Sequence, residues 1–288
     1  MHSKRHPVPS SEHIVDAAGR QYHIALAPGE VARSVLLVGD PERARRVADR
    51  FDAVEVERRH REFVAFTGAH RGLRITVLGT GIGPDNTEIA LVELCQCVER
   101  PTVIRCGSSG GVGPGVELGD LVIAQAAYRL ENTSLQFVGE GYPASAHPEV
   151  VLALAQAADE AGARYHVGLT ATAPGFYGAQ GRELPGFPPR FPHRVADLVR
   201  QGVLNLEMET SCLLSLAGLA GARAGAVCAV YAARRRGVFA TGAERRDAEA
   251  RCIEVGLRAL HLADALERAR GERPLWHPGL GPLGEETR

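Results

Sequence analysis

The sequence lacks a strong net charge, an uninterrupted apolar run and a recognisable export signal. Its 33 Lys and Arg residues nearly balance 34 Asp and Glu residues, so the composition does not favour a nucleic acid or an anionic membrane as partner. The longest apolar tract, residues 213–233, is broken by Arg223 and several glycines and predicts a helix, a turn and a strand rather than a membrane span. The opening MHSKRHPVPSSEH has no apolar core of the kind a signal peptide needs. We therefore expect a cytoplasmic protein.

Cysteine pairs suited to disulfide or metal chemistry are also missing. The six cysteines include no pair with C-x-x-C spacing and lie mostly in apolar surroundings, which is typical of reduced core residues in a cytosolic protein. Cys95 and Cys97 could ligate a metal ion, but residues at i and i+2 of one predicted helix point in different directions. The sequence thus predicts no metal site.

Strand-like and helix-like segments alternate along most of the 288 residues, of which 45% are hydrophobic. The alternation predicts an α/β fold, a single domain with a mixed central β-sheet flanked by helices. We expect the domain to span residues 21–270, between a flexible N-terminal arm, 1–20, and a flexible C-terminal tail, 271–288. The expected strands are 34–38, 53–57, 62–68, 73–78, 120–128, 166–173, 203–206 and 224–232. One helix is expected to begin at Pro41. The other expected helices are 87–98, 147–161, 210–219 and 243–269.

The stretch VIRCGSSGGVGPGVELGD, residues 103–120, carries the clearest functional signal. It predicts a strand that ends in a glycine-rich turn with one fixed cation, Arg105, and two hydroxyls, Ser108 and Ser109. Exposed N–H groups at such a turn, beside an arginine, suit a phosphate-sized anion. Two alternatives stay open: a ligand-free surface loop, and the G-x-S-x-G elbow of a serine hydrolase. The elbow requires a helix directly after the serine, and Val112-Gly113-Pro114-Gly115 is a poor helix start.

Two further glycine-containing turns precede predicted helices. Asp40 and Pro41 have helix-start chemistry, so the N–H groups there form an anion site with Arg43 on its rim. The alternative is an ordinary capped helix with solvated arginines. The run GTGIGP at 79–84 resembles a dinucleotide fingerprint, but Pro84 occupies the position of the third glycine, which argues against a nicotinamide cofactor.

Two later segments carry groups suited to a nucleoside. In FYGAQGR, residues 176–182, an aromatic ring can stack on a planar base while Gln180 and Arg182 read its polar edge. Glu207 and Glu209 flank Met208 at a strand-to-helix junction, where a carboxylate can accept hydrogen bonds from the two hydroxyls of a ribose. The alternative, an acidic helix start favoured by the helix dipole, accounts better for Glu209 than for Glu207. Residues 186–192, rich in proline and phenylalanine, predict a lid or surface loop.

Taken together, these motifs resemble nucleoside phosphorylase family I and, within it, the uridine phosphorylase branch. The resemblance runs from about residue 23 to about residue 266. Its carriers, in the family's order, are GDPERA at 39–44, HREF at 60–63, TGIG at 80–83, RCGSSGG at 105–111, FYGAQGR at 176–182 and EME at 207–209. The resemblance implies a pentosyltransferase that cleaves uridine with phosphate to uracil and ribose 1-phosphate, in pyrimidine salvage.

The resemblance also implies a role for each candidate site residue. The phosphate ligands are Gly39, Arg43, Arg105 and Ser108, with Arg61 from a neighbouring subunit. The nucleoside ligands are Phe176, Gln180, Arg182, Glu207, Met208 and Glu209, with His23 also donated across a subunit contact. The catalytic set is Arg105, Gln180, Arg182 and Glu209. Inorganic phosphate is a co-substrate, and no other cofactor is expected.

Relatives of this kind form dimers with shared sites, commonly three in a ring, so the resemblance implies a homo-oligomer and favours a hexamer. Some relatives hold a monovalent cation beside a residue matching Glu62. The purine branch and the related water-using nucleosidases tend to carry an acid after the late strand, where this chain reads Tyr231-Ala232-Ala233-Arg234. Three alternatives remain: a purine nucleoside phosphorylase, a nucleosidase and a non-catalytic nucleoside-binding protein. Ser108 replaces a common threonine, and Pro84-Asp85-Asn86 replaces a usual Gly-Pro-Ser run.

Overall fold

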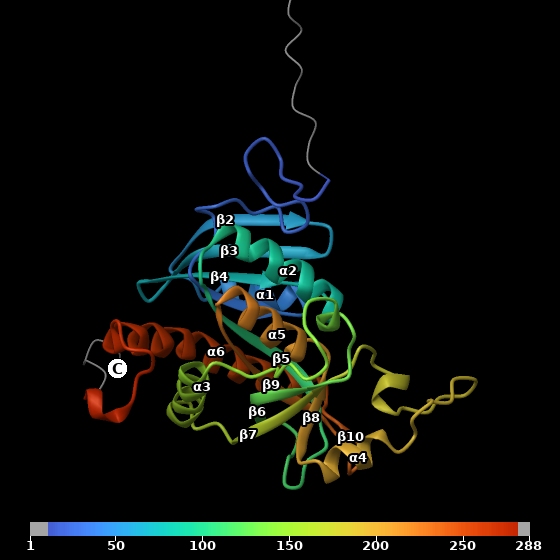
Figure 1. Cartoon of the computed structure of the whole chain (residues 1–288). Helices are drawn as coiled ribbons and strands as arrows, with labels where there is room; N and C mark the ends of the chain where they lie inside the picture. The colour runs from blue at the N-terminus through green and yellow to red at the C-terminus, as the bar shows by residue number, and fades with distance from the viewer. Residues whose placement is uncertain (1–10, 282–288) are drawn as a thin grey trace, which may run out of the picture.

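The computed structural model describes residues 11–281, in which the strands form one mixed sheet with helices on both faces (Figure 1). The strand order is β10-β9-β6-β7-β8-β5-β1-β4-β3-β2. Both parallel pairs, such as β1 with β4 and β5, and antiparallel pairs, such as β2 with β3, occur. The strands are β1 (Ser34–Val38), β2 (Ala53–His60), β3 (Phe63–His70), β4 (Leu73–Gly79), β5 (Thr102–Gly111), β6 (Leu121–Arg129), β7 (Tyr165–Thr172), β8 (Val203–Glu207), β9 (Arg223–Ala233) and β10 (Val238–Phe239).

The helices cover the two faces of the sheet and create two cores. The α-helices are α1 (Pro41–Ala48), α2 (Pro84–Cys97), α3 (Pro148–Glu160), α4 (Arg194–Arg200), α5 (Thr210–Ala220) and α6 (Gly242–Arg270). Side chains of α1, α3 and α6 pack on one face, and those of α2 and α5 pack on the other. The central strand β1 serves both cores: Leu36 and Val38 join the first, Val35 and Leu37 the second. This two-sided burial explains its unbroken apolar sequence.

Strand β5 is the point at which the sheet curls back on itself. It pairs with β1 and β9 in parallel and, at its end, with β8 antiparallel. Because β9, β6, β7 and β8 are themselves linked in that order, β5 closes these strands into a ring. Residues from both ends of the chain therefore meet around the carboxyl-terminal half of β5.

The glycine-rich segment is not the turn that we expected. Residues 107–111 continue β5 as a strand, paired with β9 along their length and with β8 at Gly110 and Gly111. Pairing on both sides satisfies the backbone and outweighs the weak strand propensity of glycine and serine. Because no helix follows Ser109, the hydrolase elbow is excluded.

The expected helices form, with boundaries shifted by a few residues. The side chain of Asp40 accepts a hydrogen bond from the Glu42 N–H, so Asp40 is the N-cap of α1, as predicted. Helix α2 starts at Pro84, three residues before the expected start, because proline suits the first turn of a helix. Residues 22–26 form a turn and an irregular segment in which Ile24 and Leu26 are buried.

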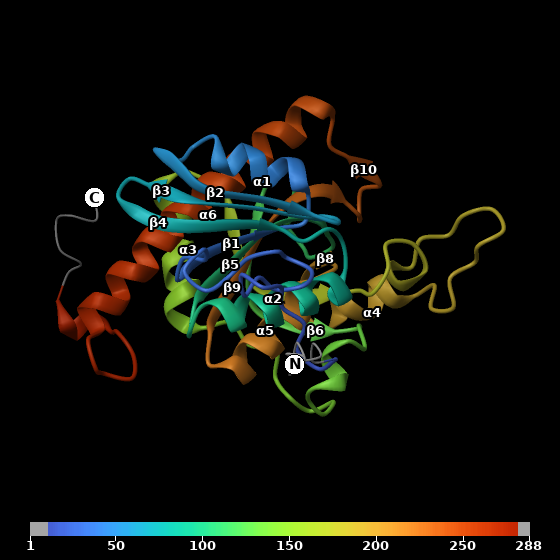
Figure 2. The ribbon, with the colours of Figure 1, turned by 90° about the horizontal axis from the view of Figure 1, so that it is seen from above.

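One segment projects from the body of the molecule. Between β7 and β8 the chain leaves the sheet as a long loop, which is clear on the right of Figure 2. It contains the short helix α4, which the sequence did not predict because its apolar pattern covers only two turns. Phe187, in the predicted lid segment, has 75% of its surface exposed.

The predicted arm and tail lie only partly within the described residues. Of the arm, residues 1–10 lie outside them, whereas Val15 forms a β-bridge with Gln21. Of the tail, residues 282–288 lie outside them, whereas the Trp276 N–H donates to Glu149. The predicted domain limits stay a prediction. Between residues 11 and 281, no helix is both long and apolar enough to cross a membrane.

Candidate active site

A cavity of about 760 Å³ opens beside the end of β5. We call it the central cavity. All but two of the predicted site residues line it: Gly39, Arg43, Arg105, Ser108, Phe176, Gln180, Arg182, Glu207, Met208 and Glu209. These residues come from four separate stretches of sequence, so the fold brings the predicted phosphate, sugar and base groups to one place.

Arg105 is held between two buried carboxylates. Its Nε donates to Glu207 at 3.2 Å, and its Nη2 is paired with Glu209. Burial lowers the pKa of the Arg105 guanidinium, but the neighbouring groups, with Glu209 first among them, together outweigh burial and raise the pKa overall. Gly107 gives this side chain its room, because an added Cβ would lie 2.7 Å from Arg105 Nη2. Arg105 is thus a permanent cation at the base of the central cavity.

Glu207 and Glu209 have different contacts. The sequence suggested that Glu209, rather than Glu207, is the acid favoured by the dipole of the helix, and the structure shows the reverse. Glu207 accepts hydrogen bonds from the N–H groups of Glu209 and Thr210 at the start of α5, so the dipole explanation fits Glu207. Glu209 accepts from the Gly83 N–H at 2.7 Å and pairs with Arg105. Burial raises the pKa of the Glu209 carboxyl, an effect that the nearby Arg105 opposes. Glu209 is therefore the better placed of the two to meet a ligand.

Arg43 does not lie on a solvated rim. It is buried, its Nε donates to Glu249 of α6 at 2.9 Å, and its Nη1 donates to the Cys106 carbonyl at 3.1 Å. The Tyr231 hydroxyl donates to the same Glu249 carboxylate at 3.4 Å. Burial lowers the pKa of Arg43, but Tyr231 and Glu249 outweigh burial and raise it. Sequence reasoning missed Glu249, because a glutamate in a charged helix carries no motif.

The residues predicted to read the base contact one another directly. Arg182 Nη1 donates to the Gln180 side-chain oxygen and to the Phe176 carbonyl, both at 2.5 Å, and its guanidinium lies 3.8 Å from the centre of the Phe176 ring. Arg234 Nη2 donates to the Gln180 carbonyl at 3.1 Å, while Arg234 Nη1 is buried without a partner among the described residues. Burial lowers the pKa of Arg182 to about 10, and Arg234 acts in the same direction. Arg182 therefore stays charged at neutral pH.

His23 and Arg61 are the two predicted residues that lie outside the central cavity of their own chain. Arg61, in the turn between β2 and β3, donates to the Tyr22 hydroxyl at 3.0 Å. Tyr22 also contacts His23 edge to face, with ring centres 4.8 Å apart, and His23 pairs with Glu93 at 2.6 Å. The two residues thus lie close to one another, and their expected role across a subunit contact stays a prediction.

The sequence is similar to those of several known proteins. The sequence model described as the Phosphorylase superfamily matches residues 33–264. A uridine phosphorylase of Thermococcus kodakarensis is 45% identical over 273 residues, which cover 94% of this chain and 97% of the relative. A uridine phosphorylase of Escherichia coli is 32% identical, with 83% and 96% covered. A purine nucleoside phosphorylase of the DeoD type from Roseobacter denitrificans is also 32% identical, with 82% and 97% covered.

The chain belongs to the phosphorylase superfamily. Its structure is similar to that of a Trypanosoma brucei nucleoside phosphorylase described as showing uridine phosphorylase activity, with a TM-score of 0.80 and 27% identity over 86% of this chain and 99% of the other. This similarity confirms the predicted α/β domain with a mixed sheet flanked by helices. The matched range also contains all six motifs that carried the resemblance.

Proposed function

We propose that this enzyme cleaves the N-glycosidic bond of uridine with inorganic phosphate, giving uracil and ribose 1-phosphate. The observation that carries the proposal is the convergence of Arg43 and Arg105, the carboxylate of Glu209 and the Gln180–Arg182 pair on one cavity. The two uridine phosphorylases described above, at 45% and 32% identity over most of the chain, support the same conclusion.

The proposed reaction needs positioning and charge rather than a covalent enzyme nucleophile. A phosphate oxygen forms a bond to C1′ of the ribose while the bond from C1′ to N1 of uracil breaks, and its electron pair stays on the base. Arg43 and Arg105 hold the phosphate, Glu209 binds the ribose hydroxyls, and Arg182 with Gln180 stabilises the negative charge on the departing ring. Phosphate is a co-substrate, and no step needs a further cofactor.

A nucleoside panel with and without phosphate tests the proposal. We expect uracil and ribose 1-phosphate from uridine only when phosphate is present. Cleavage of inosine without cleavage of uridine would mean a purine phosphorylase. Inosine is included in the panel because the chain is also similar to the purine nucleoside phosphorylase of Roseobacter denitrificans. Uracil released equally fast without phosphate would mean a nucleosidase, and uridine binding without turnover would mean a non-catalytic protein.

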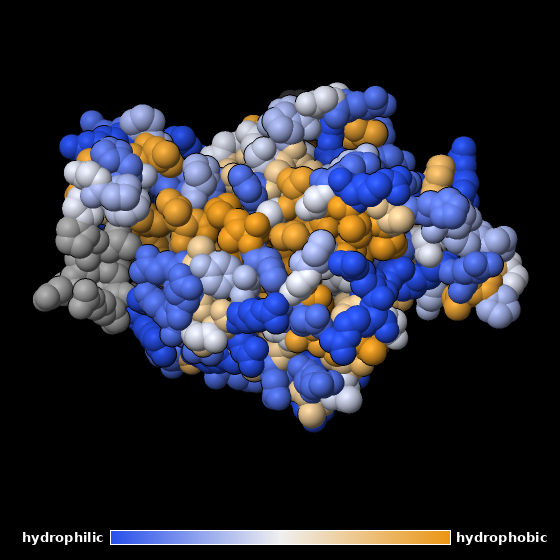
Figure 3. Space-filling model, turned by 90° about the horizontal axis from the view of Figure 1, so that it is seen from below, coloured by the Kyte–Doolittle hydropathy of each residue, from blue (hydrophilic) through white to orange (hydrophobic). Residues whose placement is uncertain are grey.

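We also propose that His23 and Arg61 complete the central cavity of a second copy of the chain. Both lie outside their own cavity, yet Glu62, next in sequence to Arg61, lines it. Apolar side chains gather across the middle of the face shown in Figure 3, on the side away from β2. On β7, Val167 and Leu169 are 43% and 36% exposed. Exposed apolar area of this kind is typical of subunit contacts. The resemblance supports a hexamer built from three dimers. It also supports a cytoplasmic location.

Mixing two inactive variants tests the shared cavity. Arg61→Ala and Glu209→Gln each disable every site of their own homo-oligomer. After unfolding and refolding together, a mixed dimer has one site with both residues intact, so activity should return. If each subunit used its own Arg61, every cavity in the mixture would carry one defect and activity would stay absent.

A further inference from the structure

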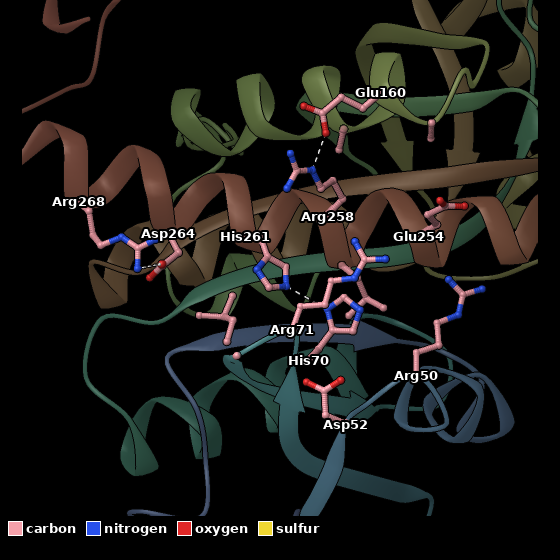
Figure 4. Close-up of a pocket in the computed structure, with 15 residues that line it drawn as sticks. Arg50, Asp52, His70, Arg71, Glu160, Glu254, Arg258, His261, Asp264 and Arg268 are labelled. Atoms are coloured by element: carbon pink, nitrogen blue, oxygen red, sulfur yellow. Dashed lines mark hydrogen bonds and ion pairs between the residues drawn. The ribbon is translucent and has the colours of Figure 1, made fainter. Parts of the chain in front are cut away.

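A second cavity, of about 820 Å³, lies on another side of the molecule (Figure 4). We call it the outer cavity. The turn between β3 and β4, the segment after α1, and the helices α3 and α6 enclose it. It shares no lining residue with the central cavity. Its volume is in the range typical of small-molecule sites, roughly 300–1,000 Å³.

Two imidazoles face one another in this cavity. His70 at the end of β3 and His261 on α6 are 191 positions apart in sequence, and their Nδ1 and Nε2 atoms lie 3.0 Å apart (Figure 4). Such a contact needs one donor and one acceptor, so at least one ring is neutral. Burial lowers the pKa of both rings, to about 4 for His261, and Arg71 lowers both further. The pair is therefore uncharged at neutral pH.

Both arginines and carboxylates line the outer cavity around the pair, and, in addition to burial, Arg71 and Arg50 lower the pKa of His70 whereas Asp52 raises it. Arg71 adopts a left-handed φ of 48° in the turn, and its side chain has no hydrogen bond or ion pair among residues 11–281. Arg50 donates only to the Ala250 carbonyl, at 3.3 Å. Arg258 and Arg268 have partners, since they pair with Glu160 at 2.5 Å and with Asp264 at 3.0 Å. Arg50 and Arg71 are thus the cations with free donors.

The free donors of Arg50 and Arg71 favour an anion and disfavour a metal ion at this end of the outer cavity. The arginines that keep the imidazoles neutral would also repel a cation at the same place. In addition, the described residues contain no group of three or more metal-ligating side chains. A dianion placed here would pair with Arg50 and Arg71 and would draw a proton onto one of the two imidazoles.

Two carboxylates at this cavity indicate what the rest of the ligand carries. The side chains of Asp52 and Glu254 line it, and neither has a hydrogen bond or ion pair within the described part of the chain. They would repel a bare polyanion, but an ionised carboxylate accepts hydrogen bonds well from hydroxyl groups. The lining therefore combines a phosphate-binding side with a hydroxyl-binding side.

We propose that the outer cavity binds a phosphate monoester of a sugar, with the phosphate against Arg50, Arg71 and the imidazole pair, and the hydroxyls toward Asp52 and Glu254. This site is independent of the proposed function, because the two cavities share no residue. Binding is coupled to proton uptake, since both imidazoles are neutral without the ligand and one of them is positive with it.

Calorimetric titration of the full-length chain with ribose 5-phosphate tests the proposal. The Arg43→Ala variant, which lacks one of the proposed phosphate-binding side chains of the central cavity, is titrated in parallel with the wild type. We expect one saturable site per chain with a Kd below about 1 mM. At pH 7, the measured heat should depend on the ionisation enthalpy of the buffer, which reports proton uptake.

Substitutions at the outer cavity separate this site from all others. Arg71→Ala, an exposed turn residue whose loss leaves the fold intact, should weaken binding about tenfold or more. Replacing both rings, His70→Gln together with His261→Gln, should remove most of the buffer dependence. Arg190→Ala, in the projecting segment, should change neither the affinity nor the buffer dependence. No saturable heat up to about 10 mM, or binding that Arg71→Ala leaves unchanged, would overturn the proposal. Equal affinity for inorganic phosphate alone would overturn the assignment to a sugar ester.

Discussion

Arg105 and Gly107 show how single residues set the charge of the central cavity. The Arg105 guanidinium has five N–H donors, and its contacts to Glu207 and Glu209 leave others free for phosphate. It reaches this position only because Gly107, two residues further along β5, has no side chain. The glycines of this strand thus clear space for a cation, whereas the sequence alone indicated glycines that cradle an anion with their own N–H groups.

Replacing Gly107 with alanine should therefore displace Arg105. The added Cβ would lie 2.7 Å from Arg105 Nη2 and 2.9 Å from Cys228 Sγ, and the two carboxylates prevent the guanidinium from moving freely. We expect a loss of stability of about 1–3 kcal/mol and a larger relative loss of kcat/KM for uridine. Urea unfolding and steady-state kinetics measure the two effects. Gly139→Ala, where the new Cβ meets no atom within 4 Å, is the control.

Arg182 is the side chain that we expect to stabilise the departing base. Arg182→Ala should lower kcat for uridine phosphorolysis by about a hundredfold or more, because it removes a donor aimed at developing charge. The KM for phosphate should change little, since phosphate binds at the other end of the central cavity. Arg190→Ala, in the same projecting segment, should have normal kinetics. A fall of only a few fold for Arg182→Ala would remove this side chain from the chemistry.

At the scale of secondary structure, helix starts were predicted more accurately than the course of β5. Local side-chain chemistry determines a helix start, and the cap at Asp40 forms as its sequence indicates. A strand made of Gly-Ser-Ser-Gly-Gly depends instead on partners distant in sequence, which here are β8 and β9. Local pattern therefore predicts a turn at residues 107–111, and only the tertiary pairing makes it a strand.

Helix α6 connects the two cavities. Glu249 near its start binds Arg43 of the central cavity, and His261, three turns later, lines the outer cavity. Arg50, also in the outer cavity, donates to the carbonyl of Ala250 beside Glu249. A ligand in the outer cavity would thus contact the same helix that positions Arg43.

The role of Glu249 can be measured through the KM for phosphate. Glu249→Ala removes the partner of the Arg43 Nε, so the KM for phosphate should rise about tenfold, the equivalent of one charge-assisted hydrogen bond. Glu249→Gln keeps an oxygen acceptor and should recover most of the affinity. Glu244→Gln, which alters the N-terminal cap of the same helix, should reduce stability without changing this KM. Equal KM values in all three variants would show that Arg43 needs no support from α6.

For the whole molecule, the sequence predicted the fold class and most of the central cavity because short motifs carried both. The phosphate, sugar and base residues lie in motifs at the ends of strands, and parallel strands bring such ends together. Glu249, Arg234 and the outer cavity could not be found in this way. Their contacts join segments far apart in sequence, such as His70 and His261, and nothing in either local pattern specifies the other.

The His70–His261 contact makes a prediction about the stability of the folded chain. Burial and nearby cations lower the pKa of His261 from 6.5 to about 4 in the folded state. The unfolded chain therefore binds a proton first as the pH falls. The stability contributed by the neutral ring is complete above pH 6.5 and decreases as the pH falls toward 4. Allowing for partial exposure, we expect a loss of about 1 kcal/mol at pH 5.

Urea unfolding at pH 7.5 and pH 5, at one protein concentration and without phosphate esters, measures this loss. Part of the decrease comes from carboxylates that become protonated, so the informative quantity is the difference between variants. His261→Gln cannot take up a proton at this position and should lose about 1 kcal/mol less than the wild type between the two pH values. His193→Gln, an exposed histidine of the projecting segment, should follow the wild type. An identical decrease in His261→Gln and wild type would show that the imidazole pair does not couple folding to pH.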